Sequence, residues 1–331
     1  MRSNDYFTSF EWFKRLLVDI NTQTWPPAFS CCNTSLGYFA RILFFLFCQF
    51  KGNYYLCSSM SGMKIAFIGR AAKYSPNSVG KDTAILAAVR MQLAAYGADC
   101  GAIVMEDLPT ADVEEADLYV SMGRKQDTLN WLGEFEKRNI PVVNCTASVM
   151  ICNQRTLLMR VLEDEDGVTV PPLFGNDGYW VKRGYGSTEC AEDVQYAANR
   201  EEADRLCEDF YNRGIIDVDV RAHVVGDLVK FYAVRGTDFF RWYYPDDTDQ
   251  KFDYGLFNGS PRHIPFDERR LRTAADRAAA MITLEVYGGD CIIRPDGEPV
   301  LIDLNDWPSF ARCREDAAVA IAEMIRKKLK S

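Results

Sequence analysis

The 331-residue sequence is poor in histidine and has no cysteine pair spaced to bind zinc. It contains two histidines, and none of its 11 cysteines forms a C-x-x-C motif. These absences exclude the common zinc sites, and the odd cysteine count gives no sign of a disulfide framework. Cysteines inside apolar stretches, such as Cys145 and Cys291, are typical of small buried thiols in a reducing compartment. We therefore expect a cytoplasmic protein.

The sequence also lacks the excess of positive charge that a nucleic-acid-binding surface needs. Its formal net charge is −9, with 48% hydrophobic and 26% charged residues, a composition typical of globular proteins. The net charge argues against nucleic acid as a partner. A nucleotide stays open, because a local basic pocket can bind phosphate on an acidic protein. The length is sufficient for two or three domains with cores of their own.

Residues 1–62 differ in composition from the rest of the chain. They hold 15 of the 42 aromatic residues and three acidic residues. Their most apolar run, Leu36–Phe50, is shorter than the about 20 residues of a membrane-spanning helix, and Arg41 interrupts it. We expect this segment to be a non-native leader, with translation starting at Met63 or Met60; the alternative is a membrane-associated leader. For residues 63–331 we expect no membrane contact.

Neither of two common phosphate-binding glycine motifs occurs in residues 63–148. The segment Ser75–Asp82 contains a Gly-Lys pair, but it lacks the first glycine and the final Ser or Thr of a P-loop. No G-x-G-x-x-G follows the first predicted strand, because Arg70 comes directly after Gly69. Strands and helices nevertheless alternate here, which predicts a parallel sheet in a Rossmann-like α/β domain. We expect strands at 64–68, 101–105, 117–122 and 141–144, and helices at 79–96 and 127–139.

Residues 149–331 show a different pattern, in which strands come in adjacent pairs. Predicted strands at 217–225 and 228–235 form a hairpin around a Val-Gly-Asp turn, and a second hairpin lies near the C-terminus. This pattern predicts an α+β domain with antiparallel sheets. The further predicted elements are strands at 179–183, 289–294 and 299–305, and helices at 147–163, 201–213, 267–287 and 314–330.

The C-terminal hairpin places two carboxylates face to face. Its strands flank the turn sequence Pro-Asp-Gly-Glu. If Arg294 pairs with Pro299, Asp290 falls opposite Asp303, and Asn305 emerges on the same face as Asp303. Opposed carboxylates repel each other, so a hard cation such as Mg²⁺ between them is the simplest explanation. The alternative is that both aspartates face solvent at the end of a hairpin.

Two lysines on predicted strands bring positive charge to the same part of the chain. Lys182 lies between apolar neighbours and precedes a glycine-containing loop, Gly184–Thr188, whose N–H groups and hydroxyls suit phosphate. Lys230 lies in an apolar strand after the Gly-Asp turn. Two lysines that face two aspartates and an asparagine form a charge-balanced box for a polyphosphate with Mg²⁺. The alternative is that both lysines lie on exposed sheet faces.

The order of these elements resembles the ATP-grasp superfamily. A Rossmann-like domain, a strand lysine, a glycine-containing loop, a second strand lysine and a D…D-x-N pattern follow one another between Lys64 and Lys330. The segment Leu301–Phe310 (LIDLNDWPSF) is similar to the closing signature of the family. The segment Asp219–Arg235 is similar to the carboxylate–amine ligase branch that includes the ribosomal-protein glutamate ligases. The resemblance implies an ATP-grasp domain over residues 149–331.

The resemblance also implies a role for each candidate residue. The residues implied to contact ATP are Lys182, Gly184, Gly186, Ser187, Arg221, Ala222, His223, Asp227 and Lys230. The implied Mg²⁺ ligands are Asp290, Asp303 and Asn305. Arg235 and Arg241 are implied to be catalytic, by stabilising charge on the transferred phosphoryl group.

The implied activity is Mg-ATP-dependent ligation of a small-molecule carboxylate to an amine through an acylphosphate. Acceptor specificity would come from the Rossmann-like domain and from Phe239–Pro265, which is either a substrate lid or a surface excursion. Two alternatives stay open: a kinase of the same fold that acts on a small hydroxyl substrate, and a nucleotide-binding protein without turnover. Two departures from the family pattern favour the second alternative: Ala222 stands in place of an acidic hinge residue, and Gly288-Gly289 stands where an arginine is common. A third departure, Asp303 in place of Glu, bears on the ligase chemistry. The sequence does not indicate the oligomeric state.

Overall fold

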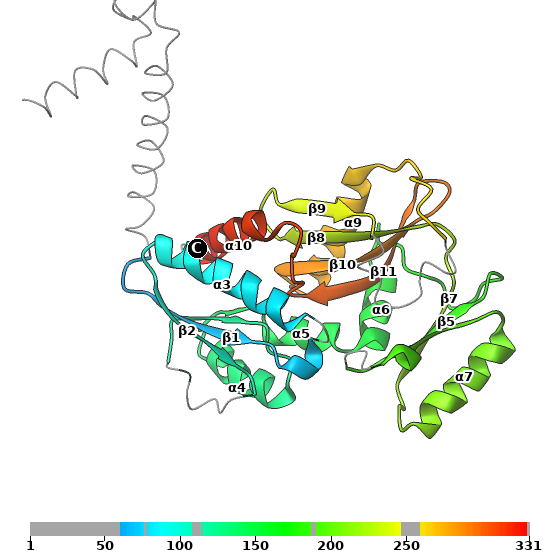
Figure 1. Ribbon diagram of the computed structural model, residues 1–331, viewed down its shortest axis with the longest axis horizontal. Coiled ribbons are helices and arrows are strands. Elements are labelled where there is room, and N and C mark those ends of the chain that lie inside the picture. The colour runs from blue at the N-terminus through cyan, green and yellow to red at the C-terminus, as the bar shows by residue number, and fades with distance from the viewer. Residues whose placement is uncertain are drawn as a thin grey trace, which may run out of the picture. The chain divides into compact units, whose positions relative to one another are not determined.

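A parallel sheet with the strand order β2-β1-β3-β4 begins the part of the chain that the structure describes. The computed structural model describes residues 60–75, 78–107, 113, 115–186, 190–245 and 259–329. All strand pairs of this sheet are parallel, as predicted, and α3 and α4 cover its opposite faces (Figure 1). Its elements are β1 (Lys64–Gly69), α3 (Val79–Ala95), β2 (Asp99–Met105), β3 (Leu118–Ser121), α4 (Gln126–Lys137) and β4 (Val142–Val143).

The connections create a switch point in the parallel sheet. The chain passes from β1 through α3 to β2 on one side, whereas β3 and β4 lie on the other side. Ligands of open α/β sheets bind in the crevice at the carboxyl ends of the strands at such a point. In this chain the switch point lies between β1 and β3.

A small antiparallel sheet carries the first strand lysine. Its strands β6 (Val194–Ala197), β5 (Tyr179–Arg183) and β7 (Val218–Ala222) pair in that order. Helix α7 (Arg200–Asn212) packs against alternate residues of these strands and forms a core with them. Because side chains alternate along a strand, Lys182 of β5 points to the opposite face.

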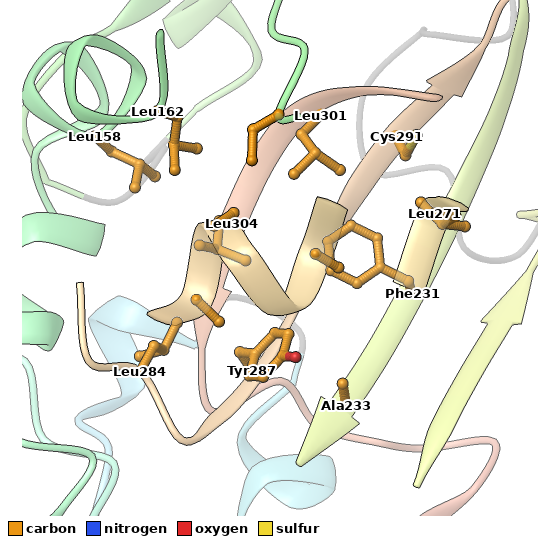
Figure 2. Packing of buried hydrophobic residues seen from close by; sticks show 14 of the residues in the cluster. Leu158, Leu162, Phe231, Ala233, Leu271, Leu284, Tyr287, Cys291, Leu301 and Leu304 are labelled. Atoms are coloured by element: carbon orange, nitrogen blue, oxygen red, sulfur yellow. The ribbon is translucent and has the colours of Figure 1, made fainter. Parts of the chain in front are cut away.

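A larger antiparallel sheet has the order β11-β10-β8-β9 and contains the C-terminal hairpin. One of its faces forms the main hydrophobic core with α6 and α9, where Leu158 and Leu271 cluster with Phe231 and Leu304 (Figure 2). Polar side chains are therefore left to its other face. The remaining elements are α5 (Thr146–Cys152), α6 (Arg155–Glu163), β8 (Asp227–Val234), β9 (Phe240–Tyr243), α9 (Glu268–Met281), β10 (Val286–Ile293), β11 (Pro299–Asp306) and α10 (Arg314–Lys328).

The hairpin predicted over residues 217–235 is wrong. β7 pairs with β5 of the small sheet, whereas β8 pairs with β10 of the large sheet. The Gly-Asp turn therefore crosses from one sheet to the other. Gly226 permits this crossing, because a Cβ atom there would lie 2.2 Å from the backbone oxygen of Ile293. Two extended segments around a turn look alike in sequence whether or not they pair with each other.

Two predicted helices are shorter than their apolar periodicity indicates. The helix predicted at 147–163 is divided into α5 and α6, because a β-bridge between Gln154 and Tyr185 interrupts it. The helix predicted at 267–287 ends before β10, which takes its last residues into the large sheet. In both cases a tertiary contact overrides a local preference.

Strands β6 and β9 are not among the predicted elements. β9 forms the start of the Phe239–Pro265 stretch, of which residues 246–258 lie outside the described chain. Short 3₁₀ helices lie at Ala72–Tyr74 and Ala191–Asp193. Within the described ranges, every helix is too short or too polar to cross a membrane.

Gly289 of β10 lies so close to its neighbours that no side chain fits. A Cβ atom there would lie 2.3 Å from the backbone oxygen of Asp303 and 2.6 Å from Cζ of Phe231. We predict that Gly289→Ala lowers the free energy of unfolding by about 1–3 kcal/mol, because overpacking shifts the backbone. Gly80→Ala on α3 is the control, since its Cβ meets nothing within 4 Å and should be neutral or slightly stabilising. Urea unfolding of both variants measures the difference, and equal stabilities would contradict the prediction.

Candidate nucleotide and metal site

A row of three charged side chains crosses the face of the large sheet opposite α6 and α9. Asp290 of β10 pairs with Asp303 of β11 on one side and with Lys230 of β8 on the other. The predicted opposition of the two aspartates is confirmed. Nζ of Lys230 donates to Oδ1 of Asp290 at 3.0 Å, which offsets part of the repulsion between the carboxylates. Lys230, Asp290 and Asp303 are called the charged row below.

The charged row depends on a β-bulge in the hairpin. Near the turn Pro299 pairs with Ile293, so the predicted pairing of Pro299 with Arg294 is wrong by one residue. The register then shifts, and Ile302 is the extra residue that restores the opposition within the charged row. Without this bulge the hairpin would not place its aspartates directly opposite each other.

Cations surround Asp303 and keep it ionised. Nη2 of Arg155, the first residue of α6, lies 3.5 Å from Oδ2 of Asp303. Burial acts to raise the pKa of Asp303, but Arg155, Lys182 and hydrogen bonds from the Asn305 side chain and the Leu304 N–H lower it on balance. Asn305 therefore lies beside Asp303, and a cation could share both side chains.

A cavity lies between the small sheet and the large sheet, next to the charged row. Lys182 is buried in it, with Nζ 6.0 Å from the centre of the Trp180 ring. A mostly apolar cleft with a few polar groups suits the flat base of a nucleotide. The lining residues are Met159, Pro171, Trp180, Lys182, Asp219, Arg221, Ala222, Val224, Ile292 and Ile302.

The predicted hinge, Arg221–Val224, borders this cavity, because Arg221, Ala222 and Val224 are among its lining residues. The N–H groups of Ala222 and His223 donate to the backbone oxygens of Pro172 and Gly178, each at 2.8 Å. These two donors are therefore used within the protein. A base in the cavity would have to meet the other backbone groups of the hinge.

The side chains of the hinge are engaged within the protein as well. Arg221 forms ion pairs with Asp219, at 3.1 Å, and with Glu163. His223 accepts a hydrogen bond on Nδ1 from Nε1 of Trp180 at 3.0 Å. Burial lowers the pKa of His223, so its imidazole is neutral near pH 7. These contacts give the cavity wall a fixed shape.

The start of the predicted phosphate loop is hydrogen-bonded to the residue before β7 and to the junction of α5 and α6. The N–H of Gly184 donates to the backbone oxygen of Asp217 and the N–H of Gly186 to that of Asn153, both at 2.8 Å. The predicted phosphate contacts of these two groups would therefore require the loop to move. Ser187 lies outside the described residues.

Asp227, for which the resemblance implies a contact with ATP, lies at the start of β8 and is buried. Its two carboxylate oxygens accept hydrogen bonds from the N–H groups of Arg262 and Ile264, at 2.9 and 2.8 Å. These two hydrogen bonds explain why the carboxylate of Asp227 is buried. The geometry gives it no contact with the charged row.

The two arginines expected to be catalytic are also not brought to the charged row. Arg235 follows β8 on the side of the strand that faces the core, opposite to Lys230. Arg241 of β9 forms an ion pair with Asp316 of α10, with Nη2 and Oδ2 3.1 Å apart. Strand alternation explains the position of Arg235, and the ion pair with Asp316 on α10 explains the position of Arg241.

Three other arginines contact aspartates of β11, and sequence reasoning missed them. Arg155 contacts Asp303, and Arg70 and Arg124 both contact Asp306 at the end of β11. A signal existed for Arg70 and Arg124, because each follows a parallel strand at its carboxyl end. No signal singles out Arg155, since an arginine at the start of a helix is common.

The structure leaves no room for an arginine at Gly288, one of the two residues where the family resemblance would place one. A Cβ atom at Gly288 would lie 3.0 Å from Cγ of Pro308, 3.1 Å from Cδ1 of Tyr232 and 2.7 Å from the backbone oxygen of Phe231. The close packing of Pro308 leaves no room for a long side chain. The guanidinium groups near the charged row therefore come from other elements.

The site offers oxygen atoms as metal ligands. In the described ranges, no group of three or more His, Cys, Asp or Glu side chains is arranged to hold a metal ion. The charged row supplies two carboxylates, and Asn305 adds an amide oxygen. Hard cations prefer such oxygens and keep other positions for water or phosphate.

Arg155 and Lys182 determine the expected effect of removing the Asp303 charge. We predict that Asp303→Asn lowers the free energy of unfolding by roughly 1 kcal/mol at neutral pH, because the two cations lose a partner. The lowered pKa of Asp303 means that its ionised form stabilises the fold above the unfolded-state pKa of about 3.9. The difference between wild type and variant should therefore shrink as the pH falls below about 4. Urea unfolding at several pH values measures it, and a variant more stable than wild type at neutral pH would count against the ion pairs.

The chain resembles solved structures in fold. No family model matches it, and no curated protein matches it in sequence. D-alanine–D-alanine ligase from Bacillus anthracis, complexed with ATP, has 12% identity and a TM-score of 0.52, over 81% of this chain and 100% of that one. A RimK-domain ATP-grasp protein from Sphaerobacter thermophilus has 17% identity and a TM-score of 0.53, over 79% and 99%. VanG D-Ala:D-Ser ligase from Enterococcus faecalis has 13% identity and a TM-score of 0.54, over 78% and 99%. The chain therefore shares the overall fold of these ligase and ATP-grasp structures.

Proposed function

We propose that the protein is a Mg-ATP-dependent ligase that joins a carboxylate to an amine through an acylphosphate. The observation that carries this proposal is the charged row, in which Asp290 and Asp303 are held face to face beside a cavity that contains Lys182. Two opposed carboxylates lower the stability of the fold unless a cation lies close enough to offset their repulsion. The shared fold with ATP-grasp ligases supports the same conclusion. In this proposal residues 63–148 and 149–331 are the two functional domains.

The cavity would take the base of ATP. Trp180 of the small sheet and Ile292 and Ile302 of the large sheet give it apolar walls. Lys182 marks its charged end, and its charge reaches Asp303. The triphosphate would therefore extend from the cavity toward the charged row, where Lys230 and Arg155 offset its negative charge.

Asp290, Asp303 and Asn305 would hold Mg²⁺. Their donor atoms are oxygens only, as a small hard cation prefers. Arg155 and Lys182 keep Asp303 ionised, so its oxygens stay available as acceptors. When bound, Mg²⁺ supplies neutralisation of the charge on the transferred phosphoryl group.

In the proposed reaction an oxygen of the substrate carboxylate takes the γ-phosphoryl group of ATP, and ADP leaves. The amine then attacks the carbonyl carbon of the acylphosphate, phosphate leaves, and an amide forms. The protein positions the reactants and balances their charge, and it forms no covalent bond with them. Lys182, Lys230 and Arg155 are the residues to which we assign the charge-balancing role.

A screen of phosphate release from Mg-ATP tests the proposed activity. The full-length chain and a chain starting at Met63 are assayed with amino acids and small carboxylates. Release that requires both a carboxylate and an amine supports the ligase. Phosphate transfer to a hydroxyl substrate without an amine would indicate a kinase instead, and ATP binding without turnover would indicate a binding protein.

Removing one carboxylate of the charged row should remove the metal dependence of ATP binding. We predict that Asp290→Asn weakens binding of ATP in the presence of Mg²⁺ by at least about tenfold, because the cation loses a charged ligand. Asp296→Asn is the matched control, since Asp296 lies at the exposed turn of the same hairpin. Titration calorimetry with and without Mg²⁺ measures both variants. If Asp290→Asn binds Mg-ATP as wild type does, the metal assignment is wrong.

Lys182 should contribute directly to ATP affinity. We predict that Lys182→Ala weakens ATP binding by roughly 10- to 100-fold, as expected for a charge-assisted contact with phosphate. Lys137→Ala on α4 is the control, because the side chain of Lys137 is 72% exposed. Equal dissociation constants for the two variants would refute the role of Lys182.

A further inference from the structure

One wall of the cavity beside the charged row carries a carboxylate. Side chains alternate along a strand, so Trp180 and Lys182 of β5 share one face of the small sheet with Asp219 and Arg221 of β7. These side chains all line the cavity, and Asp219 is the only acidic residue among the lining residues in the described part of the chain. A negative charge does not suit a place that receives phosphate. The carboxylate therefore has to serve another part of a bound nucleotide or the fold itself.

Only one oxygen of the Asp219 carboxylate is used within the described residues. Asp219 is 6% exposed, and its Oδ1 accepts a hydrogen bond from Nε of Arg221 at 3.1 Å. Its Oδ2 receives no hydrogen bond from any described residue. Because a buried acceptor without a donor costs free energy, an Oδ2 atom beside a cavity is well placed for a donor on a bound molecule.

The needs of Arg221 do not explain a second carboxylate. Nη1 of Arg221 donates to Glu163 and, at 3.1 Å, to the backbone oxygen of Pro171. Glu163 is not among the lining residues of the cavity, so it neutralises Arg221 from outside. The ion pair with Arg221 instead fixes the orientation of the Asp219 side chain. A ligand would therefore meet a carboxylate that is already held in place.

Positive charge on both sides keeps Asp219 from repelling a triphosphate. Lys182 lies directly opposite Asp219 on β5, and Arg221 is bound to its Oδ1. Cross-strand neighbours are close enough for their charges to offset each other. The carboxylate can thus take part in binding the base without opposing the phosphates.

The chemistry of adenine matches an acceptor at this position. In an adenine nucleotide the exocyclic amino group carries the only N–H donors of the base, whereas the ring nitrogens accept. An ionised carboxylate accepts hydrogen bonds and cannot donate. A base with a carbonyl oxygen in place of the amino group would turn lone pairs toward Asp219. The N–H groups of Ala222 and His223 are bound within the protein, which leaves more of the recognition of the base to the side chains of this wall.

We propose that Oδ2 of Asp219 accepts a hydrogen bond from the exocyclic amino group of the base and thereby selects adenine nucleotides. The inference deepens the proposed function, because it rests on the nucleotide cavity, and it does not depend on the ligase chemistry that follows. Asp219 determines specificity and takes no part in phosphoryl transfer.

The test compares ATP with purine riboside triphosphate, which lacks only the exocyclic amino group. Titration calorimetry measures the binding of each to the full-length protein with Mg²⁺ and without a carboxylate or amine substrate. We expect wild type to bind ATP at least about tenfold more tightly, because the analogue leaves the buried carboxylate without a donor. Asp219→Asn should reduce this preference, since a neutral oxygen accepts a weaker hydrogen bond, and Asp219→Ala should abolish it.

Glu163→Gln is the matched control, because it weakens the other ion pair of Arg221 and leaves the cavity lining unchanged. A disturbed wall affects both nucleotides alike, so the preference for ATP should keep its wild-type value. Thermal melting shows whether the variants are folded; if Asp219→Ala is not, Asp219→Asn decides. Loss of the preference in Glu163→Gln as well would assign it to the shape of the wall and overturn the direct contact.

The same titrations separate this proposal from the proposed function. If wild type binds both nucleotides equally, or if the folded Asp219 variants keep the preference for ATP, the role of Asp219 is wrong and the nucleotide cavity stands. If wild type binds neither nucleotide, the result counts against the proposed function and overturns the role of Asp219 with it.

Discussion

The candidate site depends on one constraint, which is that two carboxylates form a cross-strand pair in the last β-hairpin. Backbone register forces Asp290 and Asp303 together, and the fold must supply positive charge to hold them there. Lys230 comes from the neighbouring strand, Arg155 from the start of α6, and Lys182 from a different sheet. Because these cations are distant in sequence, the charged row becomes stable only when both antiparallel sheets and α6 have assembled. The site is therefore a product of tertiary structure, although its acids lie in one hairpin.

The segment that follows β11 connects this site to the parallel sheet. Trp307 is fully buried at a positive φ of 41°, a backbone conformation that is costly for a large side chain. Its indole N–H donates to the backbone oxygen of Val143 and its backbone N–H to that of Val286, each at 3.1 Å. Together with the arginines on Asp306, these bonds fix the end of the strand that carries Asp303. The strain at Trp307 is thus accounted for by contacts that hold the acids against the ends of the parallel strands.

The fold class and the acidic pair could be predicted from sequence because both follow from local patterns. Strand alternation and a strong turn place Asp290 opposite Asp303, but the predicted register near the turn is off by one, and the bulge at Ile302 corrects it. The prediction of that pair therefore succeeded with a local error. The crossing at Gly226 and the approach of Arg155 could not be predicted, because each depends on which distant segment lies alongside. Arg235 failed to join the site for a simpler reason: strand parity places it on the core face.

No side chain fits at Gly288, although the family resemblance would place an arginine at this residue or the next. Pro308 occupies the space that a side chain would need there, yet positive charge near the acids is not lost, because Arg155 and Arg124 approach from α6 and from the parallel sheet. The interaction energy between two charges depends on the distance between them, whichever strand or helix carries them. An alignment of sequences shows only that an arginine is missing when the positive charge comes from a different element. A superposition of backbones does not show the difference. The chain matches no family model and shares 12 to 17% identity with the solved structures of the same fold described above. For this reason the charge around the acids, taken from all elements that surround them, is the stronger basis for inferring chemistry than the residue at any one motif position.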